Sequence, residues 1–216
     1  MTTRTVWMDP RKQRTIETLL QAAEEIFSER PVAEVTVEEI AEHAGVAVGS
    51  IYNHFGSKAG LHAAVVERVL DTDRHFMDLA FTPDRGPAEQ VYAVAEQYLQ
   101  LYLQYPEYFR MLAFPGDPGQ YPAGRDLLDR MATQITEQNN RLARAIQQGI
   151  DAGIARPVDP TKVAMALLAA WNGIISLHWR PDSLRHNESE LRELLAAATD
   201  VIAHGLLRAE NSPSAT

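Results

Sequence analysis

The stretch TVEEIAEHAGVAVGSIYNHFGSKAGL, residues Thr36–Leu61, decides the fold of this chain. Thr36 and Glu39 have the spacing of a capping box, which predicts that a helix begins here. Gly45 can adopt the left-handed conformation that ends such a helix. Residues 48–55 then predict a second short helix. Two short helices joined by a glycine-bearing turn predict a helix-turn-helix, whose second helix enters the major groove of DNA.

Helices are also predicted on both sides of this stretch. Apolar residues at helical spacing predict a first helix over residues 13–28, which Pro31 ends. Ser57 is expected to cap a further helix that runs toward Leu79. The helix-turn-helix is therefore expected to form a small three-helix domain.

The predicted second helix must expose small or polar side chains at its start, because its first residues meet the bases. Val48 could contact a thymine methyl group, and Ser50 could bond a base or a phosphate. Lys58 begins the next helix, where free amides and the helix dipole favour a phosphate. The residues expected at the DNA are Ala47, Val48, Gly49, Ser50, Tyr52, Asn53, His54 and Lys58.

The rest of the chain predicts a helical body, so we expect an all-α protein of about nine helices. The predicted domains are residues 1–60 (N-terminal arm and helix-turn-helix), residues 61–208 (ligand binding and dimerisation) and residues 209–216 (a disordered tail). Residues 81–87 hold two prolines and a glycine, and residues 115–122 predict a loop. Expected helix boundaries in the body lie at Gly153, Asp159-Pro160, Pro181 and the Asn187/Glu190 cap.

Composition limits the possible functions. The chain has 216 residues and no cysteine, which excludes disulfides, thiolate metal sites and a cysteine nucleophile. Its N-terminus lacks the apolar segment of a signal peptide, and no run of about 18 apolar residues is present. We therefore expect a soluble protein in the cytoplasm. The net charge is −9, so weak non-specific DNA affinity is expected, with basic residues placed locally near the first helix.

The stretch around the turn resembles the TetR family of bacterial transcriptional regulators, whose pattern is T-x-x-x-I-A-x-x-A-G-V-x-x-G-[ST]-[LI]-Y-x-H-F-x-[SN]-K. The matching residues are Thr36, Ile40, Ala41, Ala44, Gly45, Val46, Gly49, Ser50, Ile51, Tyr52, His54, Phe55, Ser57 and Lys58. Residues 13–61 carry the close resemblance. Further along, Ala169–Gly173 is similar to a Trp-His-Gly signature of some regulatory domains in the family, with Asn172 in place of histidine.

The resemblance implies a dimer that binds a palindromic operator, often as a repressor, and that a small molecule in the helical body releases. By position it implies phosphate or base contacts for Thr36, Ser50, Tyr52, His54 and Lys58, and groove-facing places for Val48 and Gly49. Two departures stand out. Ala47 replaces a frequent serine, and Ala59-Gly60 replaces frequent acidic residues, which predicts a looser start of the next helix.

Aromatic and sulfur-bearing residues gather in the middle of the predicted body, as in a pocket for a largely apolar small molecule. Asn172 and His178 could provide polar anchors there. The same residues would serve equally well as core, and this alternative stays open. The predicted ligand-binding residues are Tyr98, Tyr102, Phe109, Met111, Phe114, Met131, Trp171, Asn172, Ile175, His178 and Trp179.

The last two long helices carry more apolar and small residues than one small core requires. Two such pairs could meet across a twofold axis and bring two recognition helices roughly 34 Å apart. We therefore expect a homodimer. The predicted interface residues are Ala166, Ala170, Gly173, Ile174, Leu195, Ala198, Ile202 and Gly205.

Two other classes of protein are alternatives to a DNA-binding regulator. An enzyme is disfavoured because none of the seven histidines forms an H-E-x-x-H motif, and because a glycine-rich phosphate loop is missing from the sequence. We expect no catalytic residue, no metal and no cofactor. The remaining alternative is an all-helical small-molecule-binding or adaptor protein that does not bind DNA.

Overall fold

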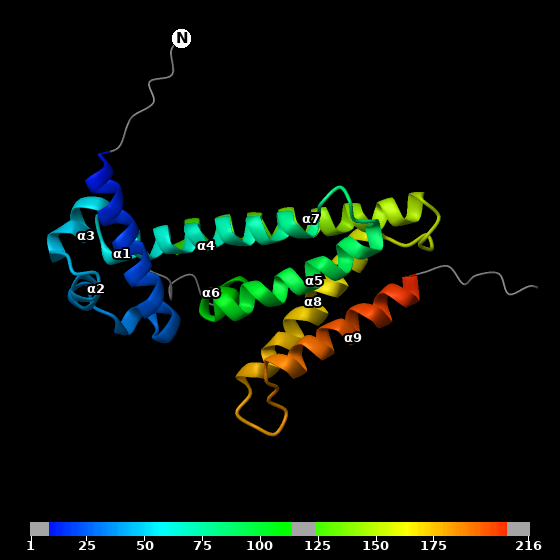
Figure 1. The fold of residues 1–216 in the computed structure, drawn as a ribbon. Helices are drawn as coiled ribbons and strands as arrows, with labels where there is room; N and C mark the ends of the chain where they lie inside the picture. The colour runs from blue at the N-terminus through cyan, green and yellow to red at the C-terminus, as the bar shows by residue number, and fades with distance from the viewer. Residues whose placement is uncertain (1–8, 114–123, 207–216) are drawn as a thin grey trace, which may run out of the picture. The chain divides into compact units, whose positions relative to one another are not determined.

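The computed structural model describes residues 9–113 and 124–206, and all regular structure in these ranges is helical (Figure 1). The prediction of an all-α fold is therefore confirmed. The elements are α1 (Pro10–Glu29), η1 (Val32–Glu34), α2 (Val37–His43), α3 (Val48–Phe55), α4 (Lys58–Ala80), α5 (Pro87–Gln104), α6 (Pro106–Ala113), α7 (Gly124–Asp151), α8 (Pro160–Ser176), η3 (Leu177–Trp179) and α9 (Glu188–Leu206).

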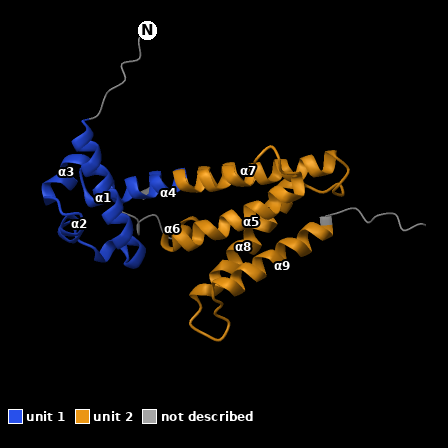
Figure 2. Cartoon of the chain, viewed as in Figure 1, with its two compact units in different colours: residues 1–70, 114–130 blue, residues 71–113, 131–216 orange. Residues whose placement is uncertain are grey.

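The chain divides into two compact units (Figure 2). Unit 1 comprises residues 1–70 and 114–130, and unit 2 comprises residues 71–113 and 131–216. Helices α4 and α7 each contribute residues to both units. The predicted boundary after residue 60 lies within the first turn of α4, whereas the units divide between Leu70 and Asp71. The predicted tail and the loop at residues 115–122 lie outside the described residues.

Unit 1 is built on the helix-turn-helix. Ile40 of α2 and Ile51 of α3 are fully buried, together with Leu19 of α1 and Leu61 of α4. Each of the four helices therefore directs an apolar residue to a common core.

Local signals place the ends of α2 and α3. The Thr36 hydroxyl accepts a hydrogen bond from the Glu39 amide at 3.2 Å, and the Glu39 carboxylate accepts one from the Thr36 amide at 2.7 Å. This is the predicted capping box. After α2, Gly45 has φ +65°, a conformation that costs glycine little. Helix α3 then spans the predicted residues.

The sequence predicts a loosely held first turn of α4, but in the structure this turn is capped. The Ser57 hydroxyl accepts a hydrogen bond from the Gly60 amide at 3.0 Å, which confirms Ser57 as a cap. A Cβ atom at residue 60 would clash directly with the backbone carbonyl oxygen of Phe55. Gly60 therefore permits a close approach between the end of α3 and the first turn of α4.

Unit 2 contains the largest buried side chains of the described residues, with Trp171 1 % and Phe109 0 % exposed. The Trp171 indole donates a hydrogen bond to the Thr199 hydroxyl at 2.9 Å, and this bond joins α8 to α9. Asn187 and Glu190 form the predicted reciprocal cap at the start of α9.

One described segment, Pro160–Trp179, is long and apolar enough to span a membrane, with a mean hydropathy of 1.2. The core helix of a soluble protein passes the same test. Only 22 % of the most apolar 18-residue stretch of this segment is buried within the single chain. Apolar side chains of α8 are therefore left exposed, with Met165 at 53 %.

Gly60→Ala is expected to lower the free energy of unfolding by about 1–3 kcal/mol, because the added methyl group must displace backbone. Gly49→Ala is the matched control, since a Cβ atom there meets nothing within 4 Å. It should raise stability by about 0.5–1 kcal/mol through helix propensity. Urea denaturation of both variants measures the difference, and equal stabilities would contradict the close approach at Gly60.

The buried His62 on α4 predicts a pH dependence of stability. Its ring packs edge-on against Phe27, with centroids 5.5 Å apart. Burial, aided by the positive charge of Lys58, lowers the pKa of His62 to about 4. The unfolded chain then binds a proton more readily than the folded chain between pH 6.5 and 4, so stability falls as pH falls through this window. The loss attributable to His62 is about 3 kcal/mol at pH 4. His62→Leu should remove this part of the pH dependence in denaturation measured from pH 7 to pH 4, and an unchanged slope would refute it.

Candidate nucleic-acid interface and ligand cavity

Helix α3 presents one face to its own unit and the other outward. Ile51 is 0 % exposed, whereas Tyr52 is 52 % exposed. Gly49 and Asn53 are also exposed. This division follows from the helical period, because residues one or two positions from a buried residue lie on other faces. Three of the predicted DNA-contacting residues of α3 therefore lie on its exposed face: Gly49, Tyr52 and Asn53.

The first turn of α3 has free amide groups. Within the described residues, Ala47 provides no side-chain hydrogen bond to cap the helix. The Ser50 amide donates to the Ala47 carbonyl at 2.8 Å, while the amides of Val48 and Gly49 lie at the uncapped end. Val48 and Ser50 are half-buried there. An uncapped helix start attracts anions, because its amide dipoles point outward.

Thr36 and Lys58 already have partners in the structure. The Thr36 hydroxyl donates to the Glu39 carboxylate at 2.9 Å. The hydrogen bond from Arg30 lowers the pKa of Glu39 to about 2. The Lys58 ammonium donates to the carbonyls of Val32 at 2.9 Å and Val35 at 2.7 Å. Two of its three N–H groups therefore tie α4 to the segment around η1, a structural role that sequence reasoning missed.

His54 is half-buried on α3, and its Nδ1 atom is buried with no hydrogen-bond partner in the described part of the chain. The centroid of the His54 ring lies 6.4 Å from that of the Phe55 ring.

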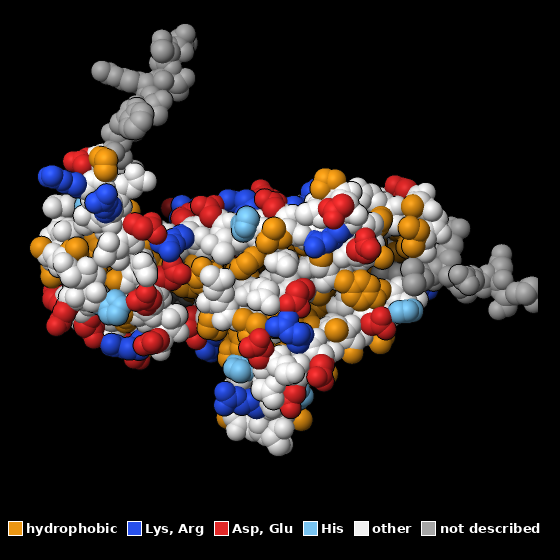
Figure 3. Space-filling model, in the orientation of Figure 1, with side chains coloured by type: hydrophobic (Ala, Val, Ile, Leu, Met, Phe, Trp, Pro, Cys, Tyr) orange, Lys and Arg blue, Asp and Glu red, His pale blue; other side chains and the backbone are white. Residues whose placement is uncertain are grey.

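Basic side chains are present at the start of α1, where Arg11, Lys12 and Arg14 are exposed. On the face shown in Figure 3, basic and acidic side chains are intermingled.

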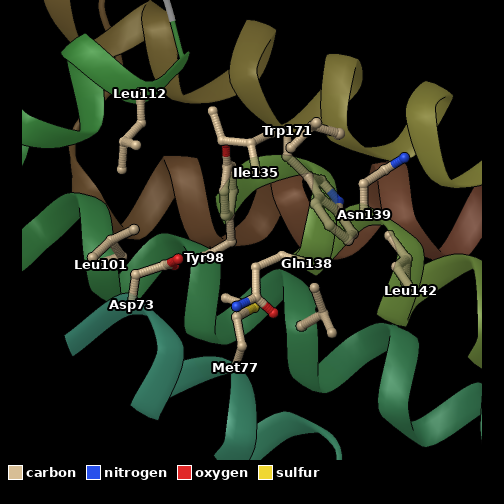
Figure 4. Close-up of a pocket in the computed structure, with 12 residues that line it drawn as sticks. Asp73, Met77, Tyr98, Leu101, Leu112, Ile135, Gln138, Asn139, Leu142 and Trp171 are labelled. Atoms are coloured by element: carbon tan, nitrogen blue, oxygen red, sulfur yellow. The ribbon is translucent and has the colours of Figure 1, made fainter. Parts of the chain in front are cut away.

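Unit 2 contains a cavity of about 40 Å³ between α4, α5, α6, α7 and α8 (Figure 4). Its walls are mostly apolar, with Met77, Leu101, Leu142 and Trp171 among them. Four polar residues line it: Asp73, Tyr98, Gln138 and Asn139. A cavity of this volume holds a few waters but is far smaller than the roughly 300–1,000 Å³ of a drug-sized site.

Two polar groups of the cavity are deeply buried. Asp73 is 6 % exposed and accepts a hydrogen bond from the Gln134 side chain at 3.0 Å. Burial raises the pKa of Asp73, since removal from water disfavours the charged form. The Tyr98 hydroxyl donates to the Asn172 side chain at 2.6 Å, and burial raises the pKa of Tyr98 as well.

The predicted ligand residues fall into different places. Tyr98 and Trp171 line the cavity, and Asn172 reaches Tyr98 through its hydrogen bond. Other predicted aromatic residues lie outside the cavity lining and surround Tyr102 with ring centroids 5.4–5.8 Å away: Phe109, His178 and Trp179. Phe109 connects them to the cavity, since its ring centroid is 5.0 Å from that of Tyr98. Met131 and Ile175 are buried core residues outside the cavity lining. Met111 is half-buried and also lies outside the lining. Phe114 lies outside the described residues.

Sequence reasoning missed Asp73, Gln138 and Asn139. Asp73 lies on the same helix as the buried Val69 and Met77, so a polar residue at an inward position was the available signal.

The predicted interface residues on α8 and α9 are mostly accessible in the single chain. Ala166, Gly173 and Gly205 are exposed, and Ala170, Ile174, Ala198 and Ile202 are half-buried. Leu195 is the exception at 3 % exposed, because it is enclosed by its own chain. Val201, which was not predicted, is an apolar residue of α9 that is 72 % exposed.

Within residues 9–113 and 124–206, no group of three His, Cys, Asp or Glu residues is placed to hold a metal ion. The fold and these two sites define a class: an all-helical protein with a helix-turn-helix unit and a second helical unit that encloses a small cavity. Residues 19–65 match the family model described as bacterial regulatory proteins, tetR family. Through this segment the chain is similar to the tetR family.

Known proteins resemble the chain over different lengths. It is 36 % identical to the HTH-type transcriptional regulator SrpR of Pseudomonas putida over 74 residues, 34 % of this chain and 33 % of SrpR. It is 43 % identical over 63 residues to TtgR of Pseudomonas putida, covering 29 % of this chain and 30 % of TtgR. The first curated relatives are thus matched over 30–52 % of their own length.

A solved structure extends the likeness to the whole fold. SmeT, the repressor of the Stenotrophomonas maltophilia multidrug efflux pump SmeDEF, superposes with a TM-score of 0.67 at 22 % identity, covering 91 % of this chain and 92 % of SmeT. At this identity the likeness concerns the fold alone. The relatives SrpR and TtgR are transcriptional regulators by name, in agreement with the expectation that the chain is not an enzyme.

Proposed function

We propose that the chain is a ligand-responsive transcriptional regulator in the cytoplasm, a repressor that binds a palindromic operator as a homodimer and is released by a small, largely apolar molecule. The observation that carries the proposal is the exposed face of α3, with Tyr52 outward and Ile51 buried behind it. A surface helix held by its back face can enter a major groove without a change of fold.

The proposed contacts at the DNA lie mainly on α3. Val48, Gly49 and Ser50 of the first turn approach the base edges, where a small side chain permits close contact. Tyr52, Asn53 and His54 carry polar groups for phosphate oxygens. Three further proposed contacts are weaker for physical reasons: Ala47 brings no polar side chain, Thr36 has its hydroxyl in a cap, and Lys58 has only one N–H group left.

The proposed dimer is formed by α8 and α9. Val201 and Met165 are the most exposed large apolar residues of these two helices. Covering such side chains with a second copy removes apolar area from water, which is favourable by about 25 cal/mol per Å². The small residues Ala166, Ala170, Gly173 and Gly205 would permit close helix approach, whereas Leu195 is left out because its own chain encloses it.

The proposed effector binds in unit 2 at the cavity that Tyr98 and Trp171 line. The cavity is about 40 Å³, so a drug-sized ligand must enlarge it. Helix α4 contributes Asp73 and Met77 to the cavity and Lys58 to unit 1, so a shift of α4 would couple the two. The ligand must prefer the released state by about 10⁴-fold to reverse the populations fully.

Replacement of Tyr52 by Ala is expected to weaken operator binding by about tenfold or more, since a hydrogen bond to a charged group contributes about 1.5–3 kcal/mol. Operators are first selected from random duplex DNA with the wild-type chain, and affinity is then measured by gel shift. Tyr92→Ala, at an exposed tyrosine of α5, is the matched control and should bind as the wild type does. Selection of no sequence from the random pool would favour the helical binding protein without DNA contacts.

Val201→Glu is expected to convert the dimer to a monomer, because a carboxylate would be buried at the centre of an apolar interface. Light scattering after size-exclusion chromatography measures the mass. Leu79→Glu changes an exposed apolar residue of α4 in the same way and should leave the mass unchanged. A wild-type chain of monomer mass at all concentrations would contradict the proposed homodimer.

A further inference from the structure

We propose that the effector carries a positively charged nitrogen, and that the Asp73 carboxylate in the cavity of unit 2 is the group that binds it. This inference rests on the proposed function, because it names the chemical class of the small molecule.

Among the residues that the structure describes, no cation is bonded to the Asp73 carboxylate. Its carboxylate accepts its hydrogen bond at 3.0 Å from the side-chain nitrogen of Gln134, which is neutral. The nearby Arg74 guanidinium is instead engaged with the Gln134 side-chain oxygen at 3.2 Å and with Asp71 at 2.6 Å. A carboxylate that is 6 % exposed and held by one neutral donor is costly, and a cation beside it relieves this cost.

Two further cavity residues present acceptors. The Asn139 side-chain oxygen is buried and has no hydrogen-bond partner in the described part of the chain. The Tyr98 hydroxyl gives its proton to Asn172, so its remaining capacity toward the cavity is that of an acceptor. Buried acceptors are satisfied by donors. An ammonium group is such a donor, since it has N–H groups and no lone pair.

The apolar and aromatic walls fit the same ligand. Tyr98 and Trp171 lie with ring centroids 5.9 Å apart, and both line the cavity (Figure 4). Aromatic faces attract cations as well as apolar groups. The present volume of about 40 Å³ accommodates a head group, and the flexible Met77 side chain can yield space to an apolar remainder. An anionic ligand would meet the like charge of Asp73.

A matched set of probes tests the inference with the full-length chain. 1-(Aminomethyl)naphthalene, 1-(hydroxymethyl)naphthalene and 1-naphthoic acid share one ring system and differ in charge at neutral pH. Isothermal titration calorimetry at pH 7 should show that the ammonium probe binds about tenfold or more tightly than the alcohol, with the carboxylate weakest. Equal affinities, tighter binding of the alcohol or acid, or no binding of the ammonium probe would overturn the inference.

Two variants separate recognition from structure. Asp73→Asn keeps the shape and an acceptor for Gln134 but removes the charge, so the ammonium probe should lose about tenfold in affinity while the alcohol is unaffected. Glu67→Gln removes a carboxylate from the same helix that pairs with Arg130 outside the cavity lining, and should change neither affinity. An equal loss for both probes in Asp73→Asn, measured beside an unchanged melting temperature, would make Asp73 structural and overturn the inference.

Failure of the charged-effector proposal can be distinguished from failure of the proposed regulatory function. Probe binding is measured without DNA, and operator binding is measured by gel shift without probe. A chain that binds its operator but does not discriminate the three probes refutes the charged effector alone. A chain that discriminates the probes but selects no DNA sequence refutes the regulator and leaves the cation site in place.

Discussion

The burial of Ile51 is the constraint on which the DNA-facing half of the structure depends. Its side chain is fully enclosed, and this burial stabilises the unit by about 1.5–3 kcal/mol. Because one residue in a helix corresponds to a rotation of about 100°, a rotated α3 would bury Tyr52 and expose the isoleucine. The contact that holds the small unit together thus also decides which side chains face outward, and folding and recognition use opposite sides of one helix.

The start of α4, which directly follows α3, is fixed by close contacts with backbone carbonyl groups. Lys58 bonds two carbonyls near η1, and Gly60 lets the Phe55 carbonyl approach the first turn of α4. A lysine that follows a helix-turn-helix was interpreted from the sequence as a phosphate ligand, but its ammonium here satisfies carbonyls that end a short segment. One residue can serve both roles, because an ammonium has three N–H groups and a bound phosphate needs only one.

The bounds of α3 could be predicted from the sequence because local signals stand on both sides of it: Gly45 ends α2 before it, and Ser57 caps α4 after it. The cavity could not be predicted in the same way. Its polar lining residues lie on three different helices, and on an isolated amphipathic helix a polar residue indicates the solvent side. The spacing of Asp73 from Val69 and Met77 indicates an inward position, but only the packing of neighbouring helices shows that this position faces a cavity. Composition also could not show that Tyr98 lines the cavity while Tyr102 and Phe109, which are connected to Tyr98 by ring contacts, do not.

The acidity of the chain and the proposed binding of DNA are compatible because electrostatic attraction to phosphate is local. Charges farther away than about 8 Å are largely screened at physiological salt, so the net charge of −9 says little about the start of α1. There Arg11, Lys12 and Arg14 are exposed, and the first turn of α1 contains no acidic residue. Elsewhere in unit 1, arginines face carboxylates, as Arg30 faces Glu39 at 2.9 Å. Acidic residues therefore neutralise the cations that support the fold, while the unpaired basic residues stand at the helix that precedes the helix-turn-helix. A low non-specific affinity follows from this arrangement, and it leaves discrimination to the first turn of α3.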